Sequence, residues 1–279
     1  MKESLELLKQ FVTREKIIII LFVFGLLCIS INYTYNQSVY CTGYMSDYPD
    51  APLEFFYYIQ MNGVNPFILI ILMLLLPNLI SYDLLDYCQN HTTYLIETRI
   101  GKRKYYKDTF FKNIYFTFLI TLILQVSILL IIHFFYGKIV FQATDYPDQY
   151  YALTQTICKN ERLNMYLFLI LTSAGYALLS SIIFSIQVFI PHKYIYRCSG
   201  VIVSTALIVV PILLMGYFPI EDIAILFQIN PLVALGIEHV RENPFGLSNI
   251  IHYFLTFSIY AIISYVLYRI LVKWRETYD

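Results

Sequence analysis

The chain alternates between long apolar stretches and short polar segments. The runs "IIIILFVFGLLCISI" and "FILIILMLLLPNLI" leave no polar face on a helix, which is typical of helices surrounded by lipid. Six stretches reach the ~20 residues that a helix needs to cross a hydrocarbon core of ~30 Å. The pattern predicts an all-α integral membrane protein, a single domain over residues 1–279, with transmembrane helices at 17–35, 65–85, 113–136, 164–190, 199–217 and 249–271.

Two segments outside these spans have a one-sided or interrupted apolar pattern. In residues 1–16, Leu5, Leu8 and Phe11 recur at helical spacing, which predicts an amphipathic helix on the inner leaflet; a solvated leader is the alternative. Residues 218–248 are apolar but interrupted by proline, glycine and several charges. We expect a re-entrant hairpin in the outer leaflet there, since a seventh span would place the basic C-terminal end outside.

The distribution of charge orients the predicted spans. The chain has 19 basic and 19 acidic side chains, is 58% hydrophobic and has a mean hydropathy of +0.62. With six spans, 15 of the Lys and Arg residues fall on one side of the membrane and four on the other. Basic residues concentrate in cytoplasmic loops, so we expect a multi-pass protein of the plasma membrane with both termini in the cytoplasm.

The segment between the second and third predicted spans is unusually basic. It contains "TRIGKRKYYKDTFFKN", in which Arg99, Arg103 and Lys107 recur at every fourth position and would form a basic stripe on a helix, interrupted at Gly101. Three interpretations compete. The charges could fix topology and contact anionic lipid heads, or a short helix could dock a soluble partner; binding of nucleic acid is disfavoured, because nothing in the segment could enter a groove.

This plan resembles the permease subunit of type-two ABC transporters. The resemblance covers the architecture of the whole chain, and "TRIGKRKYYKDTFFKN" is similar to a motif that follows the second span in that family. It implies that residues 86–112 are a cytoplasmic coupling segment that sits in a cleft of a separate ATPase. The residues it implies for that contact are Tyr94, Glu97, Arg99, Gly101, Lys102, Arg103, Tyr106 and Lys107.

The resemblance also implies a function. The chain would be the membrane-spanning subunit of a bacterial ATP-driven exporter of an amphiphilic substrate, such as a peptide antibiotic, a lipid or a drug. It would pair with two ATPase copies and a second permease, identical or related, and would bind no cofactor itself, since ATP and Mg would sit on the ATPase. The alternative is a non-transporting membrane scaffold or sensor that recruits a cytosolic partner through the basic loop.

The sequence also suggests one covalent link and one packing surface. Cys41 and Cys158 both fall in outer loops, so a disulfide between them is a hypothesis. In the fourth predicted span, Ser173, Ala177 and Ser181 recur at every fourth position. Small residues at this spacing allow close helix approach and predict a helix-packing seam, within the chain or between two chains.

Sequence motifs for catalysis are missing. The chain has no H-E-x-x-H pair, no G-x-S-x-G elbow, no G-x-x-x-x-G-K-[ST] phosphate loop and no spacing that indicates a metal site. None of the predicted spans has an acidic residue at its centre, which disfavours an ion-coupled carrier. The expected role is therefore transport without enzymatic activity in this chain.

Overall fold

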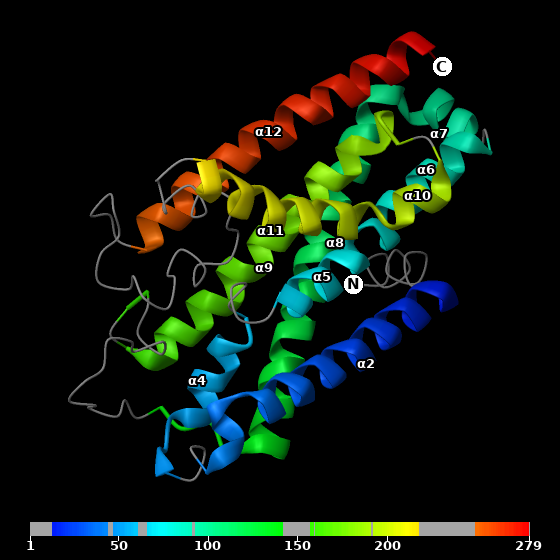
Figure 1. Cartoon of the computed structure of the whole chain (residues 1–279). Coiled ribbons are helices and arrows are strands. Elements are labelled where there is room, and N and C mark those ends of the chain that lie inside the picture. The colour runs from blue at the N-terminus through cyan, green and yellow to red at the C-terminus, as the bar shows by residue number, and fades with distance from the viewer. Residues whose placement is uncertain are drawn as a thin grey trace.

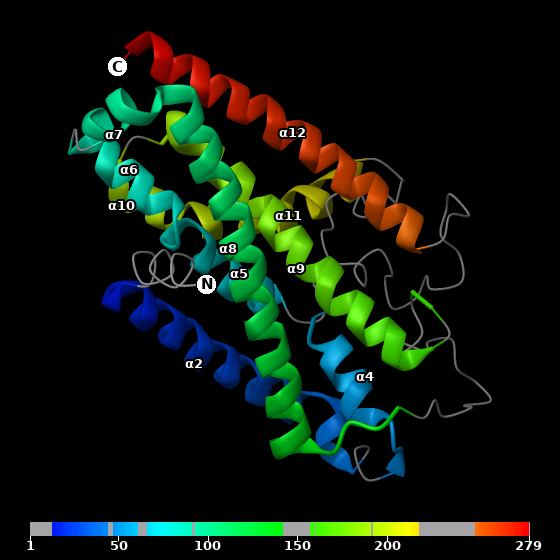
Figure 2. The ribbon, with the colours of Figure 1, turned by 180° about the vertical axis from the view of Figure 1, so that it is seen from behind.

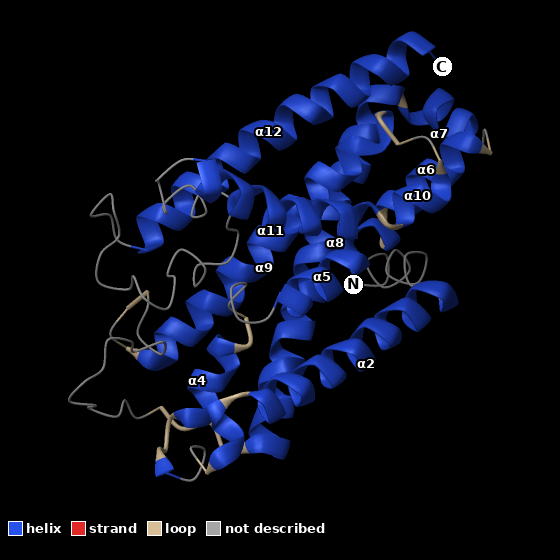
Figure 3. Cartoon of the chain, viewed as in Figure 1, coloured by secondary structure: helices blue, strands red, loops and turns tan. Residues whose placement is uncertain are grey.

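The computed structural model describes residues 13–43, 47–60, 66–90, 93–141, 157–158, 160–190, 192–217 and 249–278. Throughout these ranges the regular structure is helical, and they contain no strand (Figure 3). The predicted amphipathic helix lies almost entirely outside the described residues, and so does the predicted re-entrant hairpin at 218–248.

The described residues form a series of helices and helical turns (Figure 1). In chain order they are α2 Arg14–Gln37, η1 Val39–Thr42, α4 Ala51–Tyr58, α5 Pro66–Leu75, η2 Leu76–Asn78, α6 Ser81–Gln89, α7 Thr93–Ile100, α8 Lys102–Ile131, the π-helical turn η3 Ile132–Tyr136, α9 Glu161–Ser185, η5 Ile186–Val188, α10 Lys193–Arg197, α11 Ser199–Tyr217 and α12 Asn249–Tyr278. Helix α9 packs against both α8 and α12, while α5 packs against α2 and α11 (Figures 1 and 2).

Five helical segments in the described ranges are long and apolar enough to cross a membrane. They are Arg14–Gln37, Phe67–Gln89, Lys102–Tyr136, Glu161–Val188 and Tyr253–Glu276. The remaining predicted span, the fifth at 199–217, falls on α11, in which the apolar part Ser199–Val210 is shorter. The chain is thus compatible with a multi-pass membrane protein, and the count of six spans stays a prediction.

The second candidate span is broken at Pro77, where α5 gives way to the 3-10 turn η2. Proline has no backbone N–H, so the carbonyl of Met73, four residues earlier, loses its usual helical donor. The side chain of Asn78 donates to two carbonyl oxygens, that of Leu74 at 2.9 Å and that of Arg197 at 3.1 Å. The kink is therefore tied to the end of α10, just before α11 begins.

The basic segments gather at one end of the bundle, on the right in Figure 1. Three contacts join them. Lys16 at the start of α2 pairs with Asp83 on α6, and the Arg197 guanidinium lies 3.9 Å from the ring centroid of Tyr82 on α6. At the same end Arg103, at the start of α8, pairs with a glutamate near the end of α12. The elements that the charge pattern assigns to one side of the membrane thus lie together.

Helix α4 lies between the first and second predicted spans and turns its aromatic residues into the bundle. Its Phe55, Phe56 and Tyr57 are fully buried. The Phe56 and Tyr57 rings pack edge-on against Phe168 of α9, with centroids 5.8 and 5.1 Å away. This helix therefore folds back into the bundle and contributes to its hydrophobic core.

Candidate partner-binding site at the basic end of the bundle

Gly101 forms a sharp corner between α7 and α8. Its φ of +90° lies in the left-handed region that favours glycine. The Gly101 N–H donates to the Glu97 carbonyl at 2.8 Å, and the Gly101 carbonyl accepts from the Tyr105 N–H at 3.0 Å. The predicted basic stripe therefore does not run along one helix, because Arg99 belongs to α7 while Arg103 and Lys107 belong to α8.

Two of the predicted contact residues, Glu97 on α7 and Tyr106 on α8, are buried. Tyr106 is 1% exposed and Glu97 6% exposed. The Tyr106 hydroxyl donates to Glu97 Oε1 at 2.9 Å and lies 3.7 Å from Cys88 Sγ on α6. Lys102 Nζ lies 4.0 Å from Glu97 Oε2. These side chains hold α7 against α6 and α8. Glu97 and Tyr106 are therefore residues that position α7.

The exposed part of the predicted site is smaller than the sequence indicates. Arg99, Gly101 and Lys107 are exposed. Arg103 is exposed too, but its guanidinium forms a fork with Glu276 of α12, Nε to Oε1 at 2.5 Å and Nη2 to Oε2 at 3.3 Å. The Tyr94 side chain lies outside the described residues. On α7 itself, Arg99 is therefore the exposed cation.

A buried polar ladder along α8 was missed by the sequence reasoning. Asn113, Thr117, Thr121 and Gln125 are all fully buried, one helical turn apart. Asn113 Nδ2 donates to Ser180 Oγ on α9 at 2.7 Å, and the Thr117 hydroxyl donates to the same oxygen at 3.0 Å. The spacing of four was visible in the sequence and could have indicated the ladder. Such bonds join helices where water is absent.

The ladder continues to the opposite end of the bundle through helix α4 and its C-terminal turn. The carboxamides of Gln125 and Gln60 bond to each other, with Gln125 Nε2 to Gln60 Oε1 at 3.0 Å. Asn164 Nδ2 donates to the Tyr57 hydroxyl at 3.1 Å. Burial raises the pKa of the Tyr57 phenol above its ordinary range. Side chains from α4 and its turn are thus tied to both α8 and α9.

The two glutamines should be energetically coupled. In a double-mutant cycle of Gln60→Leu and Gln125→Leu, we expect each single variant to be destabilised and the double variant to lose less than the sum. The expected coupling energy is about 0.6 to 1.7 kcal/mol, the range for side-chain hydrogen bonds within membrane bundles. Thermal unfolding in mild detergent measures it. Additive losses would contradict a direct bond.

The other predicted residues lie apart from this site. Both cysteines are free thiols: Cys41 Sγ lies 3.0 Å from the Ser38 carbonyl oxygen, and Cys158 Sγ lies 3.3 Å from that of Asn160. The structure therefore does not contain the predicted disulfide. Ser173, Ala177 and Ser181 are buried in the chain's own core, and the Ser181 hydroxyl bonds to that of Ser264 on α12 at 2.5 Å.

Potential metal ligands do not cluster in the described ranges. Among those residues no three His, Cys, Asp or Glu side chains come together as metal ligands would. The basic end instead presents an exposed cation, Arg99, on the short helix α7, which is held to α6 and α8 through Glu97, Tyr106 and Cys88.

Comparison with known proteins does not assign the chain to a family. No family model matches the chain, and neither the curated proteins nor the solved structures contain a significant match.

Proposed function

We propose that the chain is the membrane-spanning permease subunit of an ATP-driven ABC exporter, with α7 as its coupling helix. The observation that carries the proposal is the attachment of α7. It is an eight-residue helix between two candidate spans, with Arg99 exposed on it and Glu97 hydrogen-bonded beneath it to Tyr106. A partner that grips such a helix moves both spans with it.

Transmission would be a rigid-body step. Closure of two ATPase copies on bound ATP and Mg would press on α7 from the cytoplasm. The Tyr106–Glu97 bond and the Cys88 contact would carry that displacement into α8 and α6. Two permease chains, identical or related, would then open a route for an amphiphilic substrate toward the outside. The gathering of basic segments at one end supports a cytoplasmic placement for both termini.

Copurification tests this function directly. The tagged chain is extracted from its native membrane in a mild detergent, and accompanying proteins are identified and counted by mass spectrometry. We expect a P-loop ATPase in equal amount to the permease chains, with ATPase activity in the complex. Recovery of a different cytosolic protein, under conditions that preserve known transporter complexes, would contradict the permease function. It would favour the scaffold or sensor function instead.

A further inference from the structure

A basic groove lies between the start of α8 and the last turns of α12, at the same end of the bundle as α7. Its volume is about 710 Å³. Four cations line it, Arg103 and Lys107 from α8 and Arg269 and Lys273 from α12, against a single carboxylate, that of Glu276. The lining therefore has a net charge of +3, which favours binding of an anion.

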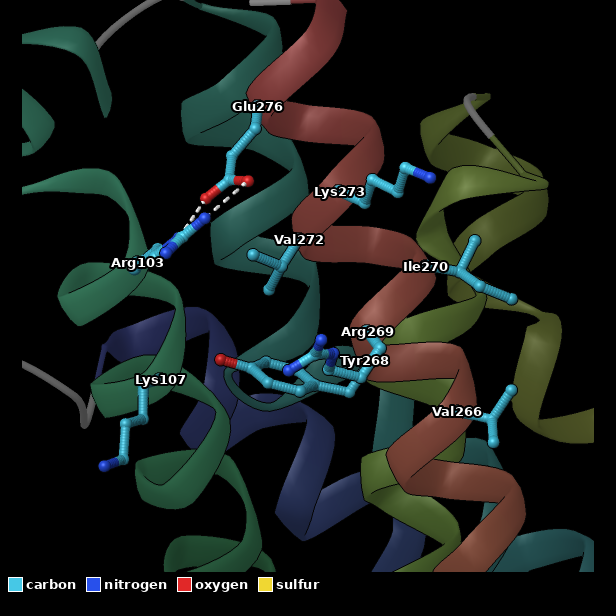
Figure 4. A pocket seen from close by; sticks show the side chains of 9 residues that line it. All are labelled: Arg103, Lys107, Val266, Tyr268, Arg269, Ile270, Val272, Lys273 and Glu276. Atoms are coloured by element: carbon cyan, nitrogen blue, oxygen red, sulfur yellow. Dashed lines mark hydrogen bonds and ion pairs between the residues drawn. The ribbon is translucent and has the colours of Figure 1, made fainter.

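The cations are arranged around an apolar floor. Figure 4 shows Tyr268, Arg269 and Val272 between the two helices, while the side chains of Lys107 and Lys273 extend outward from opposite sides. The guanidinium of Arg103 is held by Glu276 at the top of the groove. An occupant must therefore combine an anionic group with apolar surface, because a small solvated anion would leave the aromatic and aliphatic floor unused.

Beyond the groove, the exposed surface of α12 is apolar. Toward the N-terminal end of α12 from Arg269, the side chains of Ile262, Tyr265 and Val266 are 64%, 60% and 49% exposed. Arg269 and Lys273 follow this apolar stretch, so their charges sit where a membrane helix meets the headgroups. On the cytoplasmic leaflet these headgroups include anionic phospholipids.

We propose that this groove is a binding site for one anionic phospholipid, whose phosphodiester lies among Arg103, Lys107 and Arg269 and whose acyl chains follow the exposed face of α12. Arginine and lysine recognise phosphate oxygens through charge-assisted hydrogen bonds, and each cation near an anionic lipid contributes about fivefold in affinity. The lipid would bridge α8 and α12 beside the Arg103–Glu276 pair. This site does not depend on an ATPase partner.

Lipid retention by the full-length chain tests the site. The purified chain is delipidated, reconstituted into nanodiscs of equal phosphatidylglycerol and phosphatidylcholine, re-extracted and analysed by native mass spectrometry. We expect one phosphatidylglycerol per chain, with retention about thirtyfold weaker in Lys107→Gln/Arg269→Gln, since two cations are lost. The matched control Arg14→Gln/Lys104→Gln removes two exposed charges at the same membrane side without touching the groove and should retain the lipid.

Three results would overturn the proposal. The wild-type chain could retain no phosphatidylglycerol, or both double variants could lose it equally, which would indicate a general surface attraction. Inorganic phosphate or glycerophosphoglycerol could displace the lipid as effectively as added phosphatidylglycerol, which would make the site one for a soluble anion. Lys107→Arg/Arg269→Lys keeps both charges and should retain the lipid. Retention by this charge-preserving variant would attribute the loss in Lys107→Gln/Arg269→Gln to the missing charges rather than to a change of side chain at these positions.

Discussion

Gly200→Ala is expected to destabilise the folded chain by about 3 kcal/mol or more, because it forces two helices apart. A Cβ built on Gly200 at the start of α11 would lie 1.8 Å from the Met73 carbonyl oxygen of α5. That obstacle is backbone, so no rotamer change can relieve it. The same Cβ would lie 3.0 Å from the Pro77 ring. For a chain of this size the loss corresponds to a fall in Tm of roughly 6 to 12 °C.

The matched control is Gly25→Ala in α2. A Cβ there meets no heavy atom within 4 Å, so only the helical preference of alanine remains. That preference is worth about 0.5 to 1 kcal/mol, and Tm should stay or rise. Thermal unfolding of both variants in the same detergent, followed by the fraction that stays monodisperse, measures the difference. An unchanged Tm for Gly200→Ala would mean that α5 and α11 do not approach as closely as the structure has them.

The kink at Pro77 and its contact with α11 illustrate what the sequence could and could not predict. The proline and its kink are visible in the sequence. The partner that fits the kink, Gly200, lies more than a hundred residues away, and no local pattern connects the two. Apolar length predicted five of the helices because crossing a membrane is a local requirement. Which helix approaches which is set by side-chain packing over the whole bundle.

The burial of the aromatic residues between the first and second predicted spans could not be predicted for a related reason. The run "LEFFYYIQ" contains aromatic residues beside two spans, a composition typical of the membrane interface. The structure instead buries Phe55, Phe56 and Tyr57 against α9. Composition cannot distinguish an aromatic side chain that faces headgroups from one that faces a neighbouring helix. The ladder from Asn113 to Gln125 differs, because its four-residue spacing is visible in the sequence and a polar face on a span indicates contact with another helix.

The candidate site was predictable in its charge and not in its internal contacts. The basic segment between two spans indicates a cytoplasmic surface, and Gly101 indicates a break. The sequence could not reveal that Tyr106 and Glu97 bond to each other beneath α7. Nor could it reveal that Arg103 is held by Glu276, 173 residues further along the chain. Because of this second contact, a charge reversal at Arg103 would also break an ion pair, whereas Arg99 can be reversed alone.

Arg99→Glu is expected to reduce recovery of the ATPase with the tagged chain by roughly tenfold or more, because it places a like or unmatched charge at the centre of the proposed contact. Arg99 is exposed on α7, so its reversal should leave the fold and membrane insertion intact. Quantitative mass spectrometry of the copurified ATPase measures the effect, with Lys138→Glu, an exposed residue just beyond the end of η3, as the control. Normal ATPase recovery with Arg99→Glu would remove α7 as the coupling helix.

Arg103 needs a different design, because Arg103→Glu alone would place two carboxylates where the structure has an ion pair. Any loss of the ATPase could then come from a disturbed α8–α12 contact. The exchange Arg103→Glu/Glu276→Arg restores opposite charges across the same pair of helices. Since the guanidinium is engaged by Glu276, we expect the exchange to return ATPase recovery close to the wild-type level, which assigns Arg103 to the support of α8. Recovery as poor as with Arg103→Glu alone would instead place Arg103 in direct contact with the partner, beside Arg99.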